Sequence, residues 1–209
     1  MKLWHIYIVL ILSGVFLTWT TTLFLVSDSL YFNSLSSQFT YEQIQDLLDK
    51  SKKWAWLGYA IIPLVYLIKC SLVALCLEIG LFLFTNRFVF GRMFKVALLT
   101  EFIFFIPSLI KLLWFLFVKT DYTLQDLQFF YPLAALNFFD HNTLEPWLMY
   151  PLQILNFFEL VYWIVLAWGI TREFPELDMN RSMSLVATGY GSGLLVWVAI
   201  VMFVSLTYG

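Results

Sequence analysis

Long apolar runs separated by short polar connections are the main pattern of this sequence. A helix needs about 20 mostly apolar residues to cross roughly 30 Å of hydrocarbon. Backbone amides in lipid must bond within their own segment, so each such run is expected to be α-helical. By this measure five segments are predicted to span the membrane, at about 4–26, 54–84, 94–118, 147–170 and 183–206. The pattern predicts an all-α polytopic membrane protein with a single membrane domain over residues 1–209.

The connection over residues 27–53 contains a short amphipathic segment. Thr40 and Gln43 form the pattern of a capping box, in which each side chain bonds the backbone of the other. An apolar stripe follows the cap at Ile44, Leu47 and Leu48. We interpret this segment as a short interfacial helix that leads into the second span.

The connection over residues 119–146 shows a similar pattern from Thr123 onward. Apolar side chains recur at helical spacing at Leu124, Leu127 and Tyr131. Such a segment is expected to lie in the interface plane. Two interpretations are open, a loop helix packed on the bundle or a lid over a cavity, and the first is favoured.

The basic residues of the connections indicate the orientation, because cytoplasmic loops are enriched in Lys and Arg. One side collects Lys2, Arg87, Arg92, Lys95, Arg172 and Arg181. The other side collects Lys50, Lys52, Lys53 and Lys119. This six-to-four bias predicts a cytoplasmic N-terminus and an extracytoplasmic C-terminus, with 27–53 and 119–146 outside the cytoplasm.

Composition supports the membrane assignment. Hydrophobic residues make up 61% of the chain and charged residues 12%, against roughly 45–50% and 25% in soluble proteins. A soluble globule of this size could not cover its surface with so few charges. The net charge of −2 gives no basic footprint for nucleic acid. The lipid bilayer is therefore the expected environment.

Five ionisable side chains fall inside the predicted spans: Lys69, Glu78, Glu101, Lys111 and Glu159. Each costs roughly 2.5–3.5 kcal/mol on insertion scales, so each requires a partner or a function. Depth along the helices favours Lys69 with Glu159 and makes Glu101 the competing partner, also close in depth to Glu78. Lys111 is expected to extend outward or to meet Glu159. Structural ion pairs are favoured here over an ion or proton path.

The last span carries a run of small residues at Gly189, Gly191 and Gly193. Gly189 and Gly193 form a G-x-x-x-G pair, which lets a neighbouring backbone approach closely. Packing within the bundle is favoured over a dimer contact.

Motifs for catalysis or metal binding are missing from the sequence. It contains no H-E-x-x-H motif, no paired cysteines at metal spacing and no G-x-S-x-G turn. His141 lies near Asp140 and Glu145, which we interpret as a solvated turn. No catalytic residue, metal or cofactor is therefore expected, and we do not expect an enzyme.

The order of features resembles the Yip-domain family of five-span membrane proteins, the Ypt/Rab-GTPase-interacting group and its bacterial relatives. The resemblance rests on FGRMFKVALL from Phe90, LNFFELVYWIVLAWGI from Leu155 and SLVATGYGSGLL from Ser184, and it covers about residues 54–206. The aromatic-rich composition is similar to that of Bacteroidota proteins. Eukaryotic members bind small GTPases through a cytosolic region before the first span. Only three residues precede Trp4, so we do not carry that role over.

Two functions are consistent with these features. The first is a non-enzymatic scaffold, assembly partner or modulator of a complex in the inner membrane, with other membrane proteins or a second copy as partner. The alternative is a small transporter or channel-like carrier that uses the buried Lys and Glu side chains.

Overall fold

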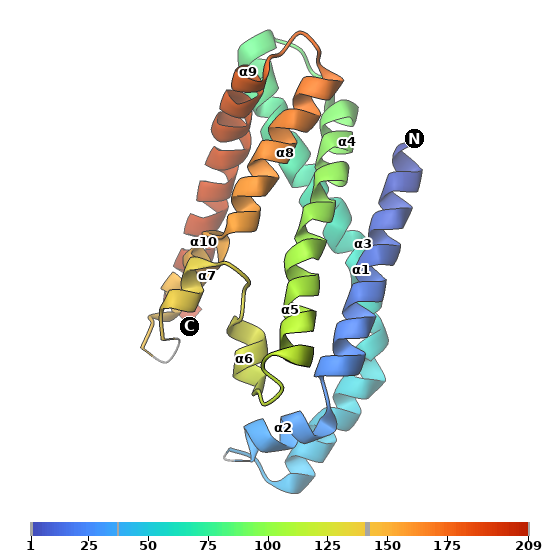
Figure 1. The fold of residues 1–209 in the computed structure, drawn as a ribbon, viewed down its shortest axis with the longest axis vertical. Helices are drawn as coiled ribbons and strands as arrows, with labels where there is room; N and C mark the ends of the chain where they lie inside the picture. Colours follow the sequence, from blue (N-terminus) through green and yellow to red (C-terminus); the bar gives the residue numbers. More distant parts are fainter. Residues whose placement is uncertain (1, 37, 141–142, 209) are drawn as a thin grey trace.

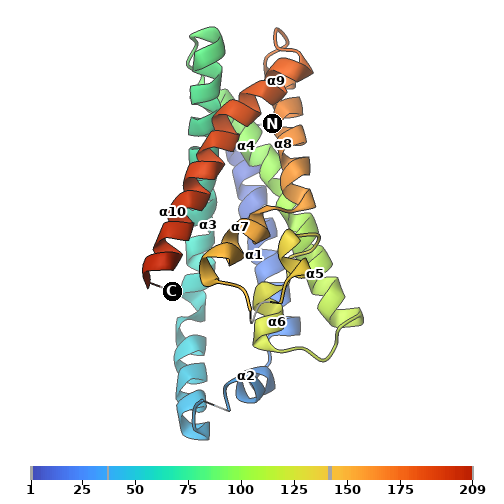
Figure 2. The same ribbon diagram turned by 90° about the vertical axis from the view of Figure 1, so that its left-hand side faces the viewer.

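The computed structural model describes residues 2–36, 38–140 and 143–208. These form a bundle in which the long helices run roughly along one axis and the short helix α2 lies across its lower end (Figures 1 and 2). The elements are α1 (Leu3–Leu25), α2 (Asp28–Leu35), α3 (Tyr41–Thr85), α4 (Phe90–Thr100), η1 (Glu101–Phe104), α5 (Phe105–Phe117), α6 (Leu124–Phe129), η2 (Ala135–Phe138), α7 (Pro146–Ile154), α8 (Phe157–Glu173), α9 (Met179–Leu185), η3 (Val186–Gly191) and α10 (Ser192–Tyr208).

Four helical segments in the described part of the chain are long and apolar enough to cross a membrane. They are Leu3–Leu25, Tyr41–Phe84, Phe90–Phe117 and Met179–Thr207. Each contains or closely matches one of the predicted spans. The chain is therefore a multi-pass membrane protein built from helices.

The prediction of one continuous helix over residues 147–170 is wrong. Helix α7 ends at Ile154, and α8 begins only after Asn156, which has an extended backbone. The Asn156 side chain accepts a hydrogen bond from the Glu159 amide at 2.8 Å and donates to the Gln153 carbonyl at 2.8 Å. Asparagine is among the best N-capping residues, so this position starts a new helix. Helix α8 has 17 residues and is about 25 Å long.

Replacing Asn156 with alanine is expected to loosen the break between α7 and α8. The loss of the cap should cost about 1 kcal/mol of the free energy of unfolding. Hydrogen–deuterium exchange of the amides in the first turn of α8 checks this. An unchanged exchange rate at Glu159 would contradict it, and Asn33→Ala on the exposed face of α2 is the control.

The segment after Thr40 forms the start of α3 rather than a separate helix. The capping box is confirmed, because Thr40 Oγ1 accepts the Gln43 amide at 3.4 Å and Gln43 Oε1 accepts the Thr40 amide at 2.9 Å. The helix then continues for 45 residues, or about 67 Å. The polar segment that begins at Tyr41 and the apolar span that follows it form one helix without a break. Helix α3 therefore extends well beyond a bilayer at its N-terminal end.

Helix α2 was not predicted from the sequence. Ser27 caps it by accepting the Leu30 amide at 3.3 Å. The helix lies beside the N-terminal end of α3 (Figure 2), where Lys52 binds Asp28 at 2.7 Å. The Ser27–Asp28 pair was the available signal, since both residue types favour helix starts.

The third predicted span is interrupted by a 3₁₀ turn, Glu101–Phe104. Pro107 lies two residues into α5 and has no amide hydrogen to donate to the carbonyl of Ile103. A short 3₁₀ segment is a common response to such an interruption. This turn is what carries Glu101.

The main core lies where α3, α4, α8 and the π-helical turn η3 meet, toward the upper end in Figure 1. At the other end of the bundle a smaller cluster of Leu25, Leu112 and Phe115 packs against Leu127 and Phe130. The segment around α6 is thus packed on the bundle. Lys119 holds it through an ion pair to Asp126 at 2.6 Å.

Helix α6 begins at a capping box that was not predicted from the sequence. Thr123 and Asp126 bond each other's backbones. Burial acts to raise the pKa of the Asp126 carboxyl, but hydrogen bonds from Lys119 and Thr123 outweigh it and lower that pKa below its usual range. The helix ends at Phe129, so Tyr131 lies beyond it and not on its apolar stripe.

Candidate functional site

A cavity of about 850 Å³ lies between α3, α5, α7, α8 and α10. In Figure 1, α10 lies to the left of α5, and α6 and α7 lie below α8. Most of its lining is apolar or aromatic, and the charged side chains on its wall are Lys69, Lys111 and Glu159. This size and composition are typical of a small-molecule site, for which about 300–1,000 Å³ is usual.

Lys69 and Glu101 form an ion pair at the wall of this cavity. Lys69 Nζ lies 2.5 Å from Glu101 Oε1 and 4.2 Å from the centre of the Phe104 ring. The Lys69 side chain is 43% exposed, whereas that of Glu101 is 3% exposed. The Lys69 ammonium therefore faces the cavity, and the Glu101 carboxylate lies behind it in the core.

The predicted pairing of Lys69 with Glu159 is wrong, and the competing partner Glu101 holds the lysine. The depth estimate assumed that residues 147–170 form one helix, which placed Glu159 at mid-span. Glu159 lies instead in the first turn of α8. Its carboxylate is held by other groups.

Glu159 Oε1 accepts two hydrogen bonds from neutral donors. The Tyr190 hydroxyl donates at 2.8 Å and the Trp163 indole at 3.0 Å. A negative charge in the first turn of a helix is also favoured by the helix dipole. Glu159 is thus fixed on the cavity wall by groups that stabilise a carboxylate without neutralising it.

Lys111 comes from α5 and does not meet Glu159. Its ammonium donates to the backbone carbonyl of Leu127 and lies 5.4 Å from the centre of the Tyr131 ring. No ion pair involving Lys111 is found in the described part of the chain. Lys111 therefore reaches toward the 119–146 connection. Of the two expectations for this lysine, the one in which it extends outward fits this contact.

The connection after α6 closes one side of the cavity. Phe130, Tyr131 and Pro132 all line it. Partial burial raises the pKa of the Tyr131 phenol, and the neighbouring Tyr150 adds to the rise. The 119–146 connection is thus both packed on the bundle and part of the cavity wall, which combines the two interpretations of this segment.

Glu78 lies away from the cavity and serves a backbone contact. It is 1% exposed and accepts a hydrogen bond from the Val89 amide. That bond joins the end of α3 to the start of α4. Glu78 and Glu101 were expected at similar depth, but no hydrogen bond joins them among the described residues.

The three glycines lie at contacts inside the bundle. An added Cβ at Gly189 would collide with the Cys76 carbonyl of α3, and one at Gly193 would lie 2.5 Å from Cys76 Sγ. A Cβ at Gly191 would lie 2.7 Å from the Trp163 ring. The surface at these three glycines is therefore already packed against other residues of this chain, as expected for packing within the bundle.

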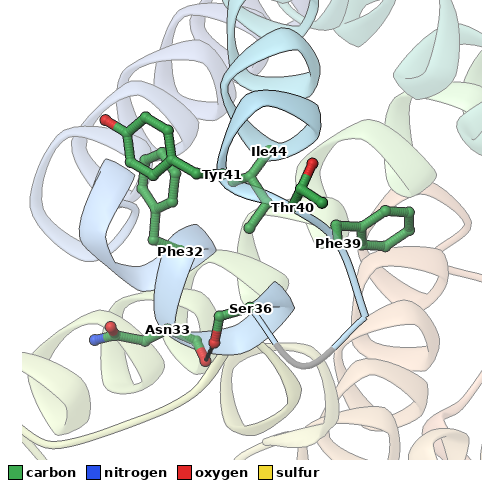
Figure 3. Close-up of a pocket in the computed structure, with 7 residues that line it drawn as sticks. All are labelled: Phe32, Asn33, Ser36, Phe39, Thr40, Tyr41 and Ile44. Carbon is green, nitrogen blue, oxygen red and sulfur yellow. Dashed lines mark hydrogen bonds between the residues drawn. The ribbon is translucent and has the colours of Figure 1, made fainter.

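A second hollow of about 640 Å³ lies between α2 and the first turn of α3 (Figure 3). Phe32 and Tyr41 stack there with ring centres 4.7 Å apart. Its polar residues include Thr40, whose oxygen already caps α3. None of the described residues that line it is charged, so we assign no site to it.

In the described residues no three side chains of His, Cys, Asp or Glu come together as metal ligands. Cys70 and Cys76 are free thiols. His141, named above with Asp140 and Glu145, lies outside the described residues.

Most of the groups that hold the charged side chains have no signal in the sequence. Tyr190 and the Leu127 carbonyl come from distant segments, and no local pattern points to them. Trp163 follows Glu159 by four residues, a spacing at which helical side chains meet, so this contact had a signal in the sequence.

Comparison with protein-family models, with curated proteins and with solved structures gave no match to this chain. The resemblance to Yip-domain proteins therefore stays a prediction.

Proposed function

We propose that this protein is a non-enzymatic carrier or binding protein of the inner membrane that holds a small amphipathic molecule in the cavity. The observation that carries this proposal is the presence of three charged side chains on the wall of a mostly apolar cavity between α3, α5, α7, α8 and α10. Charged groups at bilayer depth commonly mark substrate or ion pathways. The geometry of the cavity therefore favours a small carrier over a scaffold.

The break between α7 and α8 supports the same function. Carriers often use interrupted helices whose N-termini point at the substrate. We propose that the broken segment is the fifth to cross the membrane. In this topology the N-terminus is cytoplasmic, the C-terminus extracytoplasmic, and the break at Asn156 lies within the bilayer.

A scaffold in the inner membrane is the second candidate, and α1 favours it. This helix stands at the edge of the bundle (Figure 1) and buries only Ile6, Leu10, Gly14 and Leu25. Its remaining apolar surface is free for lipid or for another membrane protein. Stoichiometric co-purification of a second protein from native membranes would support this function.

Filling the cavity should remove a bound molecule without unfolding the protein. Val196 lines the cavity, whereas its neighbour Leu195 does not, and both are largely exposed. We expect Val196→Trp to reduce the retained small molecule at least tenfold, because the indole occupies its space. Native mass spectrometry of protein purified from native membranes measures the adduct.

Leu195→Trp is the matched control for this experiment. It should keep the adduct of the unmodified protein, and both variants should melt at similar temperatures. Equal adduct in the two variants, or none in the unmodified protein, would contradict the proposed function.

A further inference from the structure

The charges at one end of the cavity do not cancel. Lys69 binds Glu101 at 2.5 Å, and Glu159 lines the same cavity as Lys69. The ammonium is paired with Glu101, so an ionised Glu159 has no cation bound to it among the described residues. Because Glu101 is almost fully buried, Glu159 is the carboxylate that faces the cavity.

Glu159 has capacity left for a ligand. Tyr190 and Trp163 both donate to Oε1, and among the described residues Oε2 receives no hydrogen bond. An ionised carboxylate offers about four acceptor positions. A cationic donor at Oε2 would form a charge-assisted bond, which is roughly twice as strong as a neutral one.

A positive charge without an anionic partner lies at Lys111, on the wall of the same cavity. Its described partners, the Leu127 carbonyl and the Tyr131 ring, are both neutral. An ammonium has three donors, so donors remain for an anionic ligand group. The cavity thus carries one uncompensated charge of each sign.

The rest of the cavity wall is largely apolar. Aromatic side chains contribute to it at Phe130, Tyr150, Phe158 and Trp197. A ligand with a single charge would leave one of the two protein charges without a partner in an apolar site, which is costly. A ligand with both charges satisfies each.

We propose that the cavity binds a zwitterionic amphiphile, with its ammonium at Glu159, its anionic group at Lys111 and its apolar part against the aromatic wall. This inference rests on the proposed function and specifies its substrate class. A phospholipid headgroup that joins a primary ammonium to a phosphate has this chemistry. A free hydrophobic amino acid has it too.

Binding of matched probes to the full chain in detergent tests this proposal. The probes are lysophosphatidylethanolamine, lysophosphatidylglycerol and dodecylamine with equal chain lengths, and L-tryptophan. Native mass spectrometry titration measures each Kd. We expect a zwitterion to bind at least about tenfold more tightly than both single-charge probes. If lysophosphatidylethanolamine binds more tightly than tryptophan, the ligand is a phospholipid. If tryptophan binds more tightly, the ligand is a free amino acid.

Two variants test the assignment of each end. Glu159→Gln should weaken the zwitterion about tenfold and leave lysophosphatidylglycerol unchanged. Lys111→Gln should weaken both of these probes, and Lys111→Arg should restore them. Lys50→Gln, whose lysine binds Asp46 on the exposed start of α3 and outside the cavity, is the control and should bind as the unmodified protein. If Glu159→Gln does not fold, the Lys111 variants decide.

The outcomes separate this inference from the proposed function. Equal affinity for all charge types, blocked by Val196→Trp, overturns the zwitterion assignment and leaves the binding function in place. Binding that Val196→Trp and Leu195→Trp affect equally overturns both. A zwitterion preference that survives Glu159→Gln and Lys111→Gln also overturns the assignment.

Discussion

Replacing Gly189 with leucine is expected to prevent the bundle from assembling. An added Cβ would collide with the Cys76 carbonyl and lie 3.3 Å from Gly80 Cα. A Cβ at Gly80 would in turn lie 3.0 Å from the Leu185 carbonyl. Backbone meets backbone here, so no side chain can move aside, and η3 must separate from α3. We expect a loss of about 3 kcal/mol or more in the free energy of unfolding.

Gly58→Leu is the matched control because it lies in α3 with nothing within 4 Å of an added Cβ. Leucine is also the better helix former, so this variant should keep its stability. Purified yield, the size-exclusion profile and the melting temperature measure both variants. Unchanged yield and melting for Gly189→Leu would show that the glycines are not needed for close packing.

The predictions that succeeded depend on local properties of the chain. An apolar run of sufficient length must be a helix in lipid wherever its neighbours lie, so four of the segments could be located. The cap at Thr40 is equally local, because its hydrogen bonds close within three residues. Hydropathy and capping patterns therefore gave the membrane class and several helix ends.

The errors arose where one polar residue changes the path of an apolar run. Asn156 is a single residue in the segment 147–170, and hydropathy averaging hides it. Its effect as a helix cap moves Glu159 to the start of α8 and changes every depth that was counted from it. The partner of Lys69 was wrong for this reason.

The cavity could not be predicted because no segment contains it. Its charged side chains come from α3, α5 and α8, and their approach depends on how far each helix is rotated and bent. The 3₁₀ turn before Pro107 and the π turn that ends at Gly191 depart from regular α-helical geometry in two of the segments that line the cavity. A sequence pattern for straight helices does not include either.

Breaking the ion pair of Lys69 and Glu101 is expected to have an asymmetric effect on stability. Lys69→Met leaves a carboxylate that is 3% exposed without its cation, and Glu101 Oε2 already has no partner among the described residues. Removing one member of a buried pair costs about 3–5 kcal/mol. Glu101→Gln should cost less, because Lys69 is 43% exposed and its ammonium can stay solvated in the cavity.

The double variant Lys69→Met with Glu101→Gln should recover most of the loss, since neither side chain then carries a buried charge. Unfolding in mixed detergent micelles, arranged as a double-mutant cycle, measures the coupling between the two residues. Lys50→Met is the control, because its pair with Asp46 has side chains 70% and 74% exposed and should contribute less than about 1 kcal/mol. Equal costs for the two single variants would contradict the asymmetry, and additive losses in the double variant would mean that the two residues are not coupled. Recovery in the double variant would instead assign Glu101 to neutralising Lys69 and leave Glu159 as the carboxylate available to a ligand.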